Sequence, residues 1–447
     1  MRITRPLVAV ALTGAALTTL ASPPASAQKE AEAQAAPSVV VAGARALDAA
    51  RMREVRAVGE SAPNWDDVVG GDANADDPAI WVDPVWPARS VVVGALKNGG
   101  LTVFDLSGKE LQHVDTPPAP EPGAEAGRFN NVDLVTGVFV GGKRQDLAVV
   151  TDRGLDKLRL YSVDQRGSDA GRHVLTDVTS PTAPLVFTKD TAEVQDQRTA
   201  YGVAALNVGG QAYVAVSRRS ETRIGLFRLV AARGGKLSYQ AVKQFDLPST
   251  FRLSNGSTWS PCEEPGDRPQ VEGMVFDQTT ATLYAAQEDI GIWRIPVSGR
   301  PQLLEKTREF GQPATYDEET EECAPIGPPS PGAGKHLSAD AEGLTIAYRG
   351  ATRTLYASSQ GDSTFATFRI TARGLDYRSA FRIVDSRVVD GQAVDGVQHS
   401  DGAAVTTKPL GPLFPHGLLA VHDGENTPGD GDREGTNFKL VRLDDLP

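Results

Sequence analysis

The sequence predicts an all-β fold, a single six-bladed β-propeller, on three observations. The 45 glycines and 30 prolines among 447 residues favour many turns over long helices. From about Val55 onward, short β-branched or aromatic runs alternate with Gly, Asp, Asn and Pro clusters, as in strands joined by turns. Six similar segments then recur with starts about 54 to 71 residues apart, a spacing that suits a four-stranded sheet plus loops. Six such units in series indicate radial closure into one ring.

Each unit opens with a polar residue that precedes an apolar strand. The six opening residues are Asp77, Asn131, Tyr201, Glu272, Glu342 and Asp401. A second apolar run ending in a polar cluster follows each opening strand, and a third strand comes after it. A strand near Val55 to Val58 precedes the first unit, and the last unit is one strand short, so we expect the N-terminal strand to close the last blade. A pair of β-sandwiches would not explain six similar units.

The N-terminus is typical of an export signal. Arg2 and Arg5 precede an apolar stretch, and Ala25-Ser26-Ala27 matches a cleavage site, so residues 1–27 are predicted to be a signal peptide. An uncleaved membrane anchor is the alternative. Residues 28–54 are interpreted as an Ala/Glu-rich linker and residues 55–447 as the propeller. We therefore expect a secreted, extracellular monomer with no membrane attachment after signal cleavage.

Composition excludes several classes of function. The formal net charge of −12 argues against a nucleic-acid partner, which would favour a basic surface. Two cysteines and six histidines leave no room for a cysteine-rich zinc module and little for histidine-dependent metal chemistry. Histidine acid phosphatase, cysteine phosphatase and Gly-x-Ser-x-Gly motifs are also absent from the sequence.

The opening residues of the units indicate a metal site. In a propeller they converge around one end of the channel, with Asp76, Asp133 and Asp340 beside them, and converging carboxylates repel one another unless a proton or cation neutralises them. Oxygen ligands without clustered His or Cys favour a hard cation, and an irregular set favours Ca²⁺ over Mg²⁺. The alternative is that each acid caps a turn next to a glycine.

The polar clusters after the second strands divide the same rim into two arcs. Units one to three contribute basic residues, namely Lys97, Arg153, Arg218 and Arg219. Units four to six contribute mainly acidic ones, namely Glu288, Asp289, Gln360, Asp423 and Glu425. A basic arc facing calcium suits a polyanion whose phosphates are held by Lys and Arg. Metal-bound water could then attack phosphorus.

The motifs of this rim resemble those of the β-propeller phytases, the secreted bacterial 3-phytase family. The similarity runs from about Glu60 to Lys439 and is carried by Asp76-Asp77-Pro-Ala-Ile-Trp, Asn130-Asn131-Val-Asp133, Val271-Glu272-Gly-Met, Glu288-Asp289, Asp340-Ala-Glu342-Gly, Ser358-Ser-Gln360-Gly and Asp423-Gly-Glu425-Asn426. The resemblance implies a six-bladed, calcium-dependent phosphomonoesterase that binds several calcium ions and takes calcium phytate, myo-inositol hexakisphosphate, as its substrate.

The resemblance also implies roles for individual residues. Lys97 and Arg153 correspond to phosphate-binding residues, and Arg219 corresponds to a third, with Arg218 as the alternative. The implied calcium ligands and catalytic-site residues are Tyr201, Glu272, Glu288, Asp340, Glu342 and Gln360. Further implied calcium ligands are Asp77, Asp395, Asp401, Asp423, Glu425 and Asn426. Glu60 is a weaker match, and His399 stands where the family has a carboxylate.

Two inserts flank the fourth unit, at about Ser249 to Gln270 and Arg308 to His336. Each carries one cysteine, and both are rich in Pro, Gly and acids, with too little apolar content to pack by themselves. Because a secreted chain meets oxidising conditions, we expect a Cys262–Cys323 disulfide, with two free thiols as the alternative.

Two other functions stay open on the residues alone. A six-bladed calcium-dependent lactonase or esterase would share the calcium-lined channel but would not need three converging basic residues. A non-catalytic secreted binding propeller would explain the fold but not the opposed arcs. Fold alone does not decide between them.

Overall fold

The computed structural model describes residues 52–68, 74–164, 173–387, 393–431 and 433–447, and this part of the chain is almost entirely β. The predicted signal peptide and most of the predicted linker lie outside the described residues. The helical segments described are α3 (Thr191–Val194), η2 (Pro87–Arg89), η3 (Arg233–Gly235) and η4 (Gln360–Asp362). None of the helices in the described ranges is long and apolar enough to cross a membrane.

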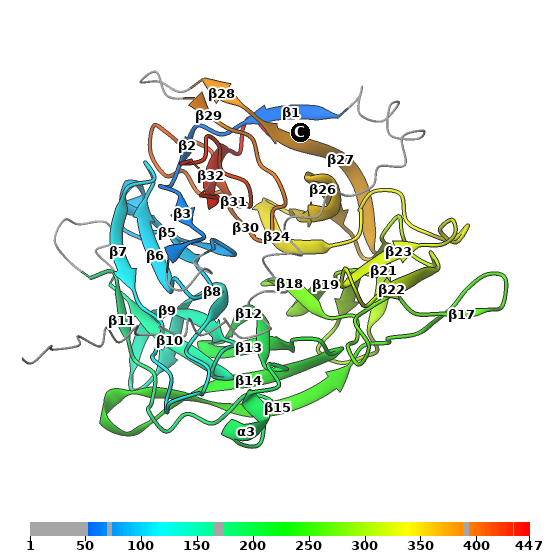
Figure 1. Cartoon of the computed structure of the whole chain (residues 1–447). Helices are drawn as coiled ribbons and strands as arrows, with labels where there is room; N and C mark the ends of the chain where they lie inside the picture. The colour runs from blue at the N-terminus through cyan, green and yellow to red at the C-terminus, as the bar shows by residue number, and fades with distance from the viewer. Residues whose placement is uncertain (1–51, 69–73, 165–172, 388–392, 432) are drawn as a thin grey trace, which may run out of the picture. The chain divides into compact units, whose positions relative to one another are not determined.

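Six antiparallel sheets form the blades (Figure 1). Blade one contains β4 (Pro78–Trp81), β5 (Val91–Ala95), β6 (Leu101–Asp105) and β7 (Glu110–Val114). Blade two contains β8 (Phe129–Val140), β9 (Lys143–Asp152), β10 (Lys157–Val163) and β11 (Leu175–Asp177). Blade three contains β12 (Ala200–Val208), β13 (Gln211–Arg218), β14 (Arg223–Ala231) and β15 (Leu237–Asp246).

The remaining blades follow the same order along the chain. Blade four contains β18 (Val271–Asp277), β19 (Thr282–Gln287), β20 (Gly291–Ile295) and β21 (Gln302–Lys306). Blade five contains β24 (Ala341–Arg349), β25 (Thr352–Ser359), β26 (Thr364–Ile370) and β27 (Leu375–Val384). Blade six contains β30 (Ala403–Thr406), β31 (Leu418–Asp423) and β32 (Gly435–Arg442).

The first strands of the blades contact one another around the ring. The sequence of contacts runs from β4 through β8, β12, β18, β24 and β30 and returns to β4. A single closed ring removes long exposed sheet edges. The predicted six-bladed propeller is therefore confirmed.

Strand direction determines which end of the ring carries the site. Because neighbouring strands within each blade are antiparallel, the start of the first strand lies beside the end of the second. The turns between second and third strands, and the connections from one blade to the next, thus lie at the same end as the six opening residues. We call this end the site face.

The N-terminal segment closes the ring in two steps. Gly59–Glu60, strand β2, pairs antiparallel with β32 and completes blade six as its fourth strand. The short strand β3 (Asn64–Trp65) pairs with the start of β32. The strand expected near Val55 to Val58 is instead β1 (Arg53–Arg56), which pairs parallel with β27 and adds a fifth strand to blade five. Closure of the last blade by the N-terminal segment is confirmed, but its position is later than expected.

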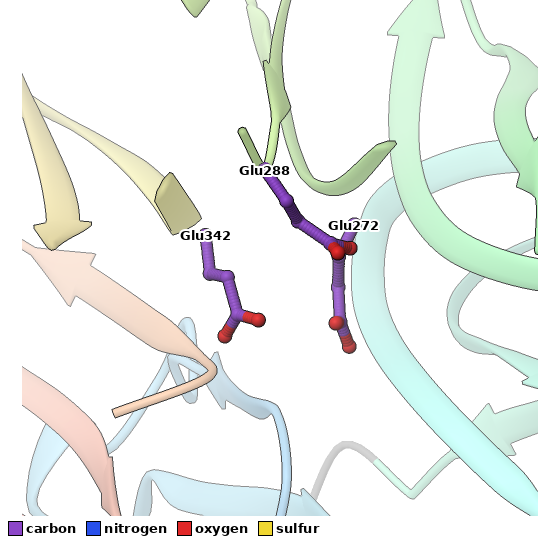
Figure 2. A group of neighbouring side chains, drawn as sticks. All are labelled: Glu272, Glu288 and Glu342. Carbon is purple, nitrogen blue, oxygen red and sulfur yellow. The ribbon is translucent and has the colours of Figure 1, made fainter. Parts of the chain in front are cut away.

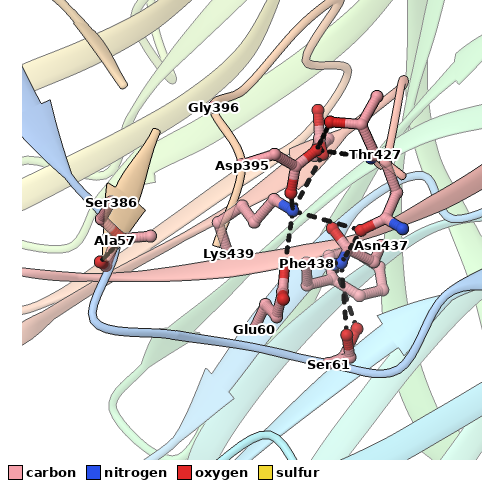
Figure 3. A network of polar contacts seen from close by, with 12 residues as sticks. Ala57, Glu60, Ser61, Ser386, Asp395, Gly396, Thr427, Asn437, Phe438 and Lys439 are labelled. Carbon is pink, nitrogen blue, oxygen red and sulfur yellow. Dashed lines mark hydrogen bonds and ion pairs between the residues drawn. The ribbon is translucent and has the colours of Figure 1, made fainter. Parts of the chain in front are cut away.

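A buried lysine contacts acidic side chains from several of the segments that close the ring (Figure 3). Lys439 of β32 is fully buried, and its ammonium group lies 2.6 Å from the carboxylate of Glu60 and 3.1 Å from that of Asp423. It also contacts the carboxylate of Asp395 and, at 3.2 Å, the amide oxygen of Asn426. Since a charge is rarely buried without partners, this cation and its ligands stabilise one another across segments that are far apart in sequence.

Removal of this cation should strongly destabilise the ring. In Lys439→Met the carboxylates would remain without a counter-charge, so we expect a loss of about 3–5 kcal/mol in the free energy of unfolding. Chemical denaturation followed by tryptophan fluorescence measures it. Lys243→Met is the matched control, because Lys243 is exposed and its loss should change stability by only a few tenths of a kcal/mol. Equal stability of the two variants would contradict the importance of this ion cluster.

Candidate active site

β-Bulges begin four of the six first strands. The register shifts lie between Phe129 and Val132, Ala200 and Val203, Val271 and Met274, and Ala341 and Leu344. The opening residues Asn131, Tyr201, Glu272 and Glu342 all fall within these bulges. Because a bulge bends its strand and re-aims a side chain, the repeated bulge explains why residues at equivalent positions gather at the site face.

A glycine follows four of the six opening residues, Tyr201, Glu272, Glu342 and Asp401, and permits close approach between neighbouring blades. A Cβ atom at Gly202 would lie 2.0 Å from the backbone oxygen of Glu272, and one at Gly273 would lie 2.2 Å from that of Glu342. Both distances are far below van der Waals contact. These glycines lie within strands, so the interpretation of the neighbouring acids as turn caps does not describe these positions.

Three carboxylates come together at the centre of the site face (Figure 2). Glu272 of β18, Glu288 after β19 and Glu342 of β24 each offer one carboxylate oxygen, and these atoms all lie within 4.8 Å of one another. We call them the glutamate triad. The Oε1 atom of Glu288 is buried without a hydrogen-bond partner among the described residues. An oxygen-only set with an unsatisfied buried acceptor fits a hard cation such as Ca²⁺.

Neutral donors orient Glu272. The hydroxyl of Tyr201 donates to its Oε2 at 2.7 Å, and the side-chain amide of Asn130 donates to its Oε1 at 2.8 Å. Burial raises the pKa of Tyr201 well above its usual value, and the charge of Glu272 raises it further. Tyr201 therefore remains a protonated donor throughout the physiological range.

Gln360 links the triad to the sixth blade. Its side-chain amide donates to Glu342 Oε2 at 3.1 Å and to Asp401 Oδ1 at 2.5 Å. The backbone N–H of Asp401 donates to Nδ1 of the fully buried His422 at 3.0 Å. Glu342 and Asp401 are thus held by groups that add no positive charge.

Burial raises the pKa values of all three triad carboxyl groups. The next cause for Glu272 and Glu342 is the charge of Asp401, and for Glu288 it is the charge of Glu272. Burial also raises the pKa of Asp340 to about 6, with repulsion from Glu309 and Asp401 behind it. Such a cluster favours binding of a proton or a cation.

Two basic side chains adjoin the triad. Lys97 follows β5, is 8% exposed, and places its ammonium group 4.0 Å from Oδ2 of Asp76. Arg153 follows β9, donates to the amide oxygen of Asn130 at 3.1 Å, and lies 5.8 Å from the ring centre of Tyr201. Both cations lower the pKa of Glu272 against the effect of burial. The arrangement can hold an anion beside the carboxylates.

The two arginines of blade three differ in their surroundings. Arg218 donates to the backbone oxygen of Arg198 at 2.7 Å, lies 3.7 Å from the carboxylate of Glu193 and sits 6.0 Å from the ring of Phe187. Its guanidinium is therefore held towards α3. Arg219 is anchored through its backbone N–H, which donates to Thr199 at 2.9 Å.

The inserts lie on the site face and pack on each other. Cys262 and Cys323 form the expected disulfide, with their Cα atoms 6.0 Å apart. Phe251 and Trp259 of the first insert lie 5.3 and 4.9 Å from Phe310 of the second, between ring centres. A few aromatic side chains from both segments thus provide the packing, which agrees with the expectation that neither insert has enough apolar content to pack by itself.

Beside the disulfide, Glu263 adds a carboxyl group to the acidic arc. It hydrogen-bonds with Asp289, and burial raises its pKa to about 7. Burial and the charge of Glu263 together raise the pKa of Asp289 well above the usual range. Burial and mutual repulsion therefore both favour uptake of a proton by this pair.

The other predicted ligands lie in two further places. Asp395, Asp423 and Asn426 surround Lys439, whose ammonium group supplies positive charge to their oxygens. Glu425 lies 3.3 Å from Nε2 of His399.

Asp77 and Asp133 face a central cavity of about 140 Å³. Asp77 accepts a hydrogen bond from Val132 N at 3.2 Å, and Asp133 accepts one from Ala205 N at 2.7 Å. Asp76 lies nearer the triad, since the charge of Glu272 raises its pKa after burial does. Of the opening residues, Tyr201, Glu272, Glu342 and Asp401 are therefore linked around the triad by hydrogen bonds, whereas Asp77 faces this cavity and the remaining acids lie in separate environments.

Comparison with known proteins identifies the family. The family model described as Phytase matches residues 28–252 and 329–447. The chain belongs to the phytase family. It is 28% identical over 389 residues to the 3-phytase of Bacillus subtilis, covering 85% of this chain and 82% of that protein. Membership of this family makes the chain a phytase, an enzyme class that hydrolyses phytate. This decides against the lactonase and binding-propeller alternatives.

Solved structures with similar folds are more distant. The calcium-binding protein regucalcin of Agrobacterium tumefaciens matches with a TM-score of 0.41 at 10% identity, covering 88% of this chain and 97% of that one. The Malassezia sympodialis allergen Mala s 1 matches with a TM-score of 0.40 at 13% identity, covering 85% and 96%.

Three side chains of the site were not predicted. Asn130, Gln270 and Glu263 contact Glu272, Glu288 and Asp289 respectively. Asn130 stands in the motif Asn130-Asn131-Val-Asp133 without having been given a role, and Gln270 lies two residues before Glu272, which is a weaker signal. Glu263 carries no such signal because the insert places it.

The metal-free protein should lose stability as pH rises through about 6. Asp340 and Asp133 have pKa values of about 6 in the folded state, whereas an unfolded Asp has a pKa of about 3.9. Between these values the folded state binds more protons, so the free energy of unfolding falls with increasing pH. In chelator, calorimetry should show a lower melting temperature at pH 7 than at pH 5. A rise over this interval would contradict the raised pKa values.

Proposed function

We propose that this phytase is a calcium-dependent phosphomonoesterase that hydrolyses myo-inositol hexakisphosphate by direct attack of water. The observation that carries the proposal is the juxtaposition of the glutamate triad with Lys97 and Arg153. Opposite charges this close, in a buried setting, suit a phosphate group shared between cations and basic side chains. The match to the 3-phytase of Bacillus subtilis supports the substrate class.

The carboxylates are assigned to the metal. Glu272, Glu288 and Glu342 would hold calcium at the centre, with Asp76, Asp340, Gln360 and Asp401 at its margin. Calcium, when bound, supplies positive charge to phosphate oxygens and makes a nearby water more acidic. We leave the cluster around Lys439 out of the calcium set, because an ammonium group already neutralises it.

The basic and aromatic residues are assigned to the substrate. Lys97, Arg153 and Arg219 bind phosphate oxygens and orient the phosphorus for in-line attack. Tyr201 holds Glu272 in place by its hydroxyl and supports the guanidinium of Arg153 by its ring face. Arg218 acts on the turn and not on the substrate, because its guanidinium is engaged near α3.

Export is part of the proposal. The A-x-A site at Ala25 to Ala27 would release a mature protein outside the cytoplasm. The Cys262–Cys323 disulfide supports this location, because disulfides persist in oxidising compartments.

The central test is release of inorganic phosphate from phytate with calcium and with excess chelator. Activity should require calcium, and Glu272→Gln should lower kcat by at least roughly tenfold, about 1.4 kcal/mol of transition-state stabilisation, through loss of charge at nearly constant volume. Full activity in chelator would refute the calcium assignment. Isolation of a phosphorylated protein during turnover would refute direct attack by water.

Adjacent arginines provide a matched pair for the phosphate assignment. Arg219→Ala should lower kcat/KM for phytate by at least roughly tenfold, because a direct charge-assisted contact to a substrate phosphate is lost. Arg218→Ala removes contacts to Glu193 and Phe187 and should affect mainly the melting temperature. Steady-state kinetics of both variants measure this difference, and the reverse pattern would exchange the two roles.

A further inference from the structure

Two neutral amide side chains connect the glutamate triad to Arg153 and to the turn that follows Arg219. Asn130 accepts a hydrogen bond from Arg153 at 3.1 Å through Oδ1 and donates to Glu272 Oε1 at 2.8 Å through Nδ2. It also donates to Asn131 Oδ1 at 2.7 Å, and it is only 1% exposed. A single rigid amide thus spans a phosphate-binding candidate and a metal-binding candidate.

Gln270 makes the equivalent connection one blade further on. Its Oε1 accepts the backbone N–H of Ser220 at 2.7 Å, in the turn that directly follows Arg219. Its Nε2 donates to Glu288 Oε2 at 3.0 Å, and its backbone oxygen accepts the N–H of Glu288 at 3.2 Å. Ser220 has a left-handed backbone, with φ of 53°, so this bond also supports a strained turn.

The polarity of each amide is determined by its neighbours. If the amide of Asn130 were rotated by 180°, its oxygen would face the carboxylate of Glu272 and its NH₂ group would face the guanidinium of Arg153. Both new contacts would repel. The same holds for Gln270 between Glu288 and the N–H of Ser220, so both amides have one stable orientation.

At these positions a neutral donor differs from a basic residue in its effect on the charge of the carboxylate. It fixes one oxygen of a carboxylate without neutralising the charge, so the carboxylate keeps its affinity for a cation. For Glu288 the outcome is visible in the structure, since Oε2 is held by Gln270 while the buried Oε1 has no hydrogen-bond partner among the described residues. Partners of this kind commonly tune metal ligands.

We propose that Asn130 and Gln270 are positioning residues that orient Glu272 and Glu288 for calcium and hold the phosphate-binding arc in register with them. The inference rests on the proposed function, because it assumes that these carboxylates bind calcium. Neither amide touches the reacting atoms, so each acts through the residues it holds.

The first experiment compares the full-length protein with Asn130→Leu and Gln270→Leu, which remove both hydrogen-bonding ends at similar volume. Titration calorimetry with calcium chloride measures affinity, and phytate hydrolysis measures kcat and KM. We expect each variant to bind calcium roughly 10- to 100-fold more weakly and to lose kcat by a similar factor. Asn207→Leu is the matched control, since the amide of Asn207 also links two blades, in this case two and three, but lies at the end opposite the site face.

A second variant separates orientation from simple attraction. Gln270→Lys would keep a donor near Glu288 but add a positive charge. If the neutrality of the amide is the essential property, this variant should melt higher than Gln270→Leu in chelator and yet bind calcium more weakly than Gln270→Leu. Recovery of calcium affinity in Gln270→Lys would overturn the inference, because it would show that any donor suffices.

The outcomes distinguish this inference from the proposed function. Wild-type calcium affinity and turnover in both Leu variants would overturn the positioning roles while leaving the phytase assignment intact. If the wild-type protein binds calcium but releases no phosphate, the proposed function fails, and weaker calcium binding in the Leu variants still supports the positioning roles. If the wild-type protein binds no calcium, both are overturned.

Discussion

Close packing of the six first strands at one end of the ring is the constraint on which the site depends. Glycine at positions such as Gly202 and Gly273 lets the backbone of one blade reach the opening residue of the next. That approach forces Glu272, Glu288 and Glu342 together, where burial and mutual repulsion raise their pKa values. The fold thus stores an unfavourable concentration of negative charge, which only protons or cations can relieve.

The protein gives its buried carboxylates different partners at two places. At the ring closure, Lys439 provides a permanent internal cation for the carboxylates of Glu60 and Asp423. At the triad, the partners are Tyr201, Asn130, Gln270 and Gln360, all of which donate hydrogen bonds without charge. A permanent cation stabilises a structure but leaves nothing to bind. Neutral donors leave the negative charge of the carboxylates available to a bound cation. A binding site requires this property, whereas the ring closure around Lys439 does not.

The sequence could predict the parts that repeat. Six similar units led to the propeller, their opening residues led to Glu272 and Glu342, and the polar cluster after a second strand led to Glu288, because equivalent positions in a ring must converge. It could not predict where β1 pairs, since Arg53–Arg56 has one buried residue and its partner is chosen by tertiary packing. The ion cluster was also missed, because a lysine inside a strand is ordinarily exposed. The roles of Asn130 and Gln270 were not predicted, because an amide acquires a role only through the charges that folding places beside it.

The inserts join the ring directly beside the site. The family match stops at residue 252 and resumes at 329, although the intervening chain contains blade four with Glu272 and Glu288. Lengthening a connection costs little in loop entropy, so the inserts can vary provided that the chain re-enters the ring at a fixed point. Gln270 is that point, because its side chain and its backbone both bond to neighbouring turns. The residue that ends the first insert is therefore the one that holds the turn carrying Glu288, so the blade re-enters the ring with this ligand candidate already positioned.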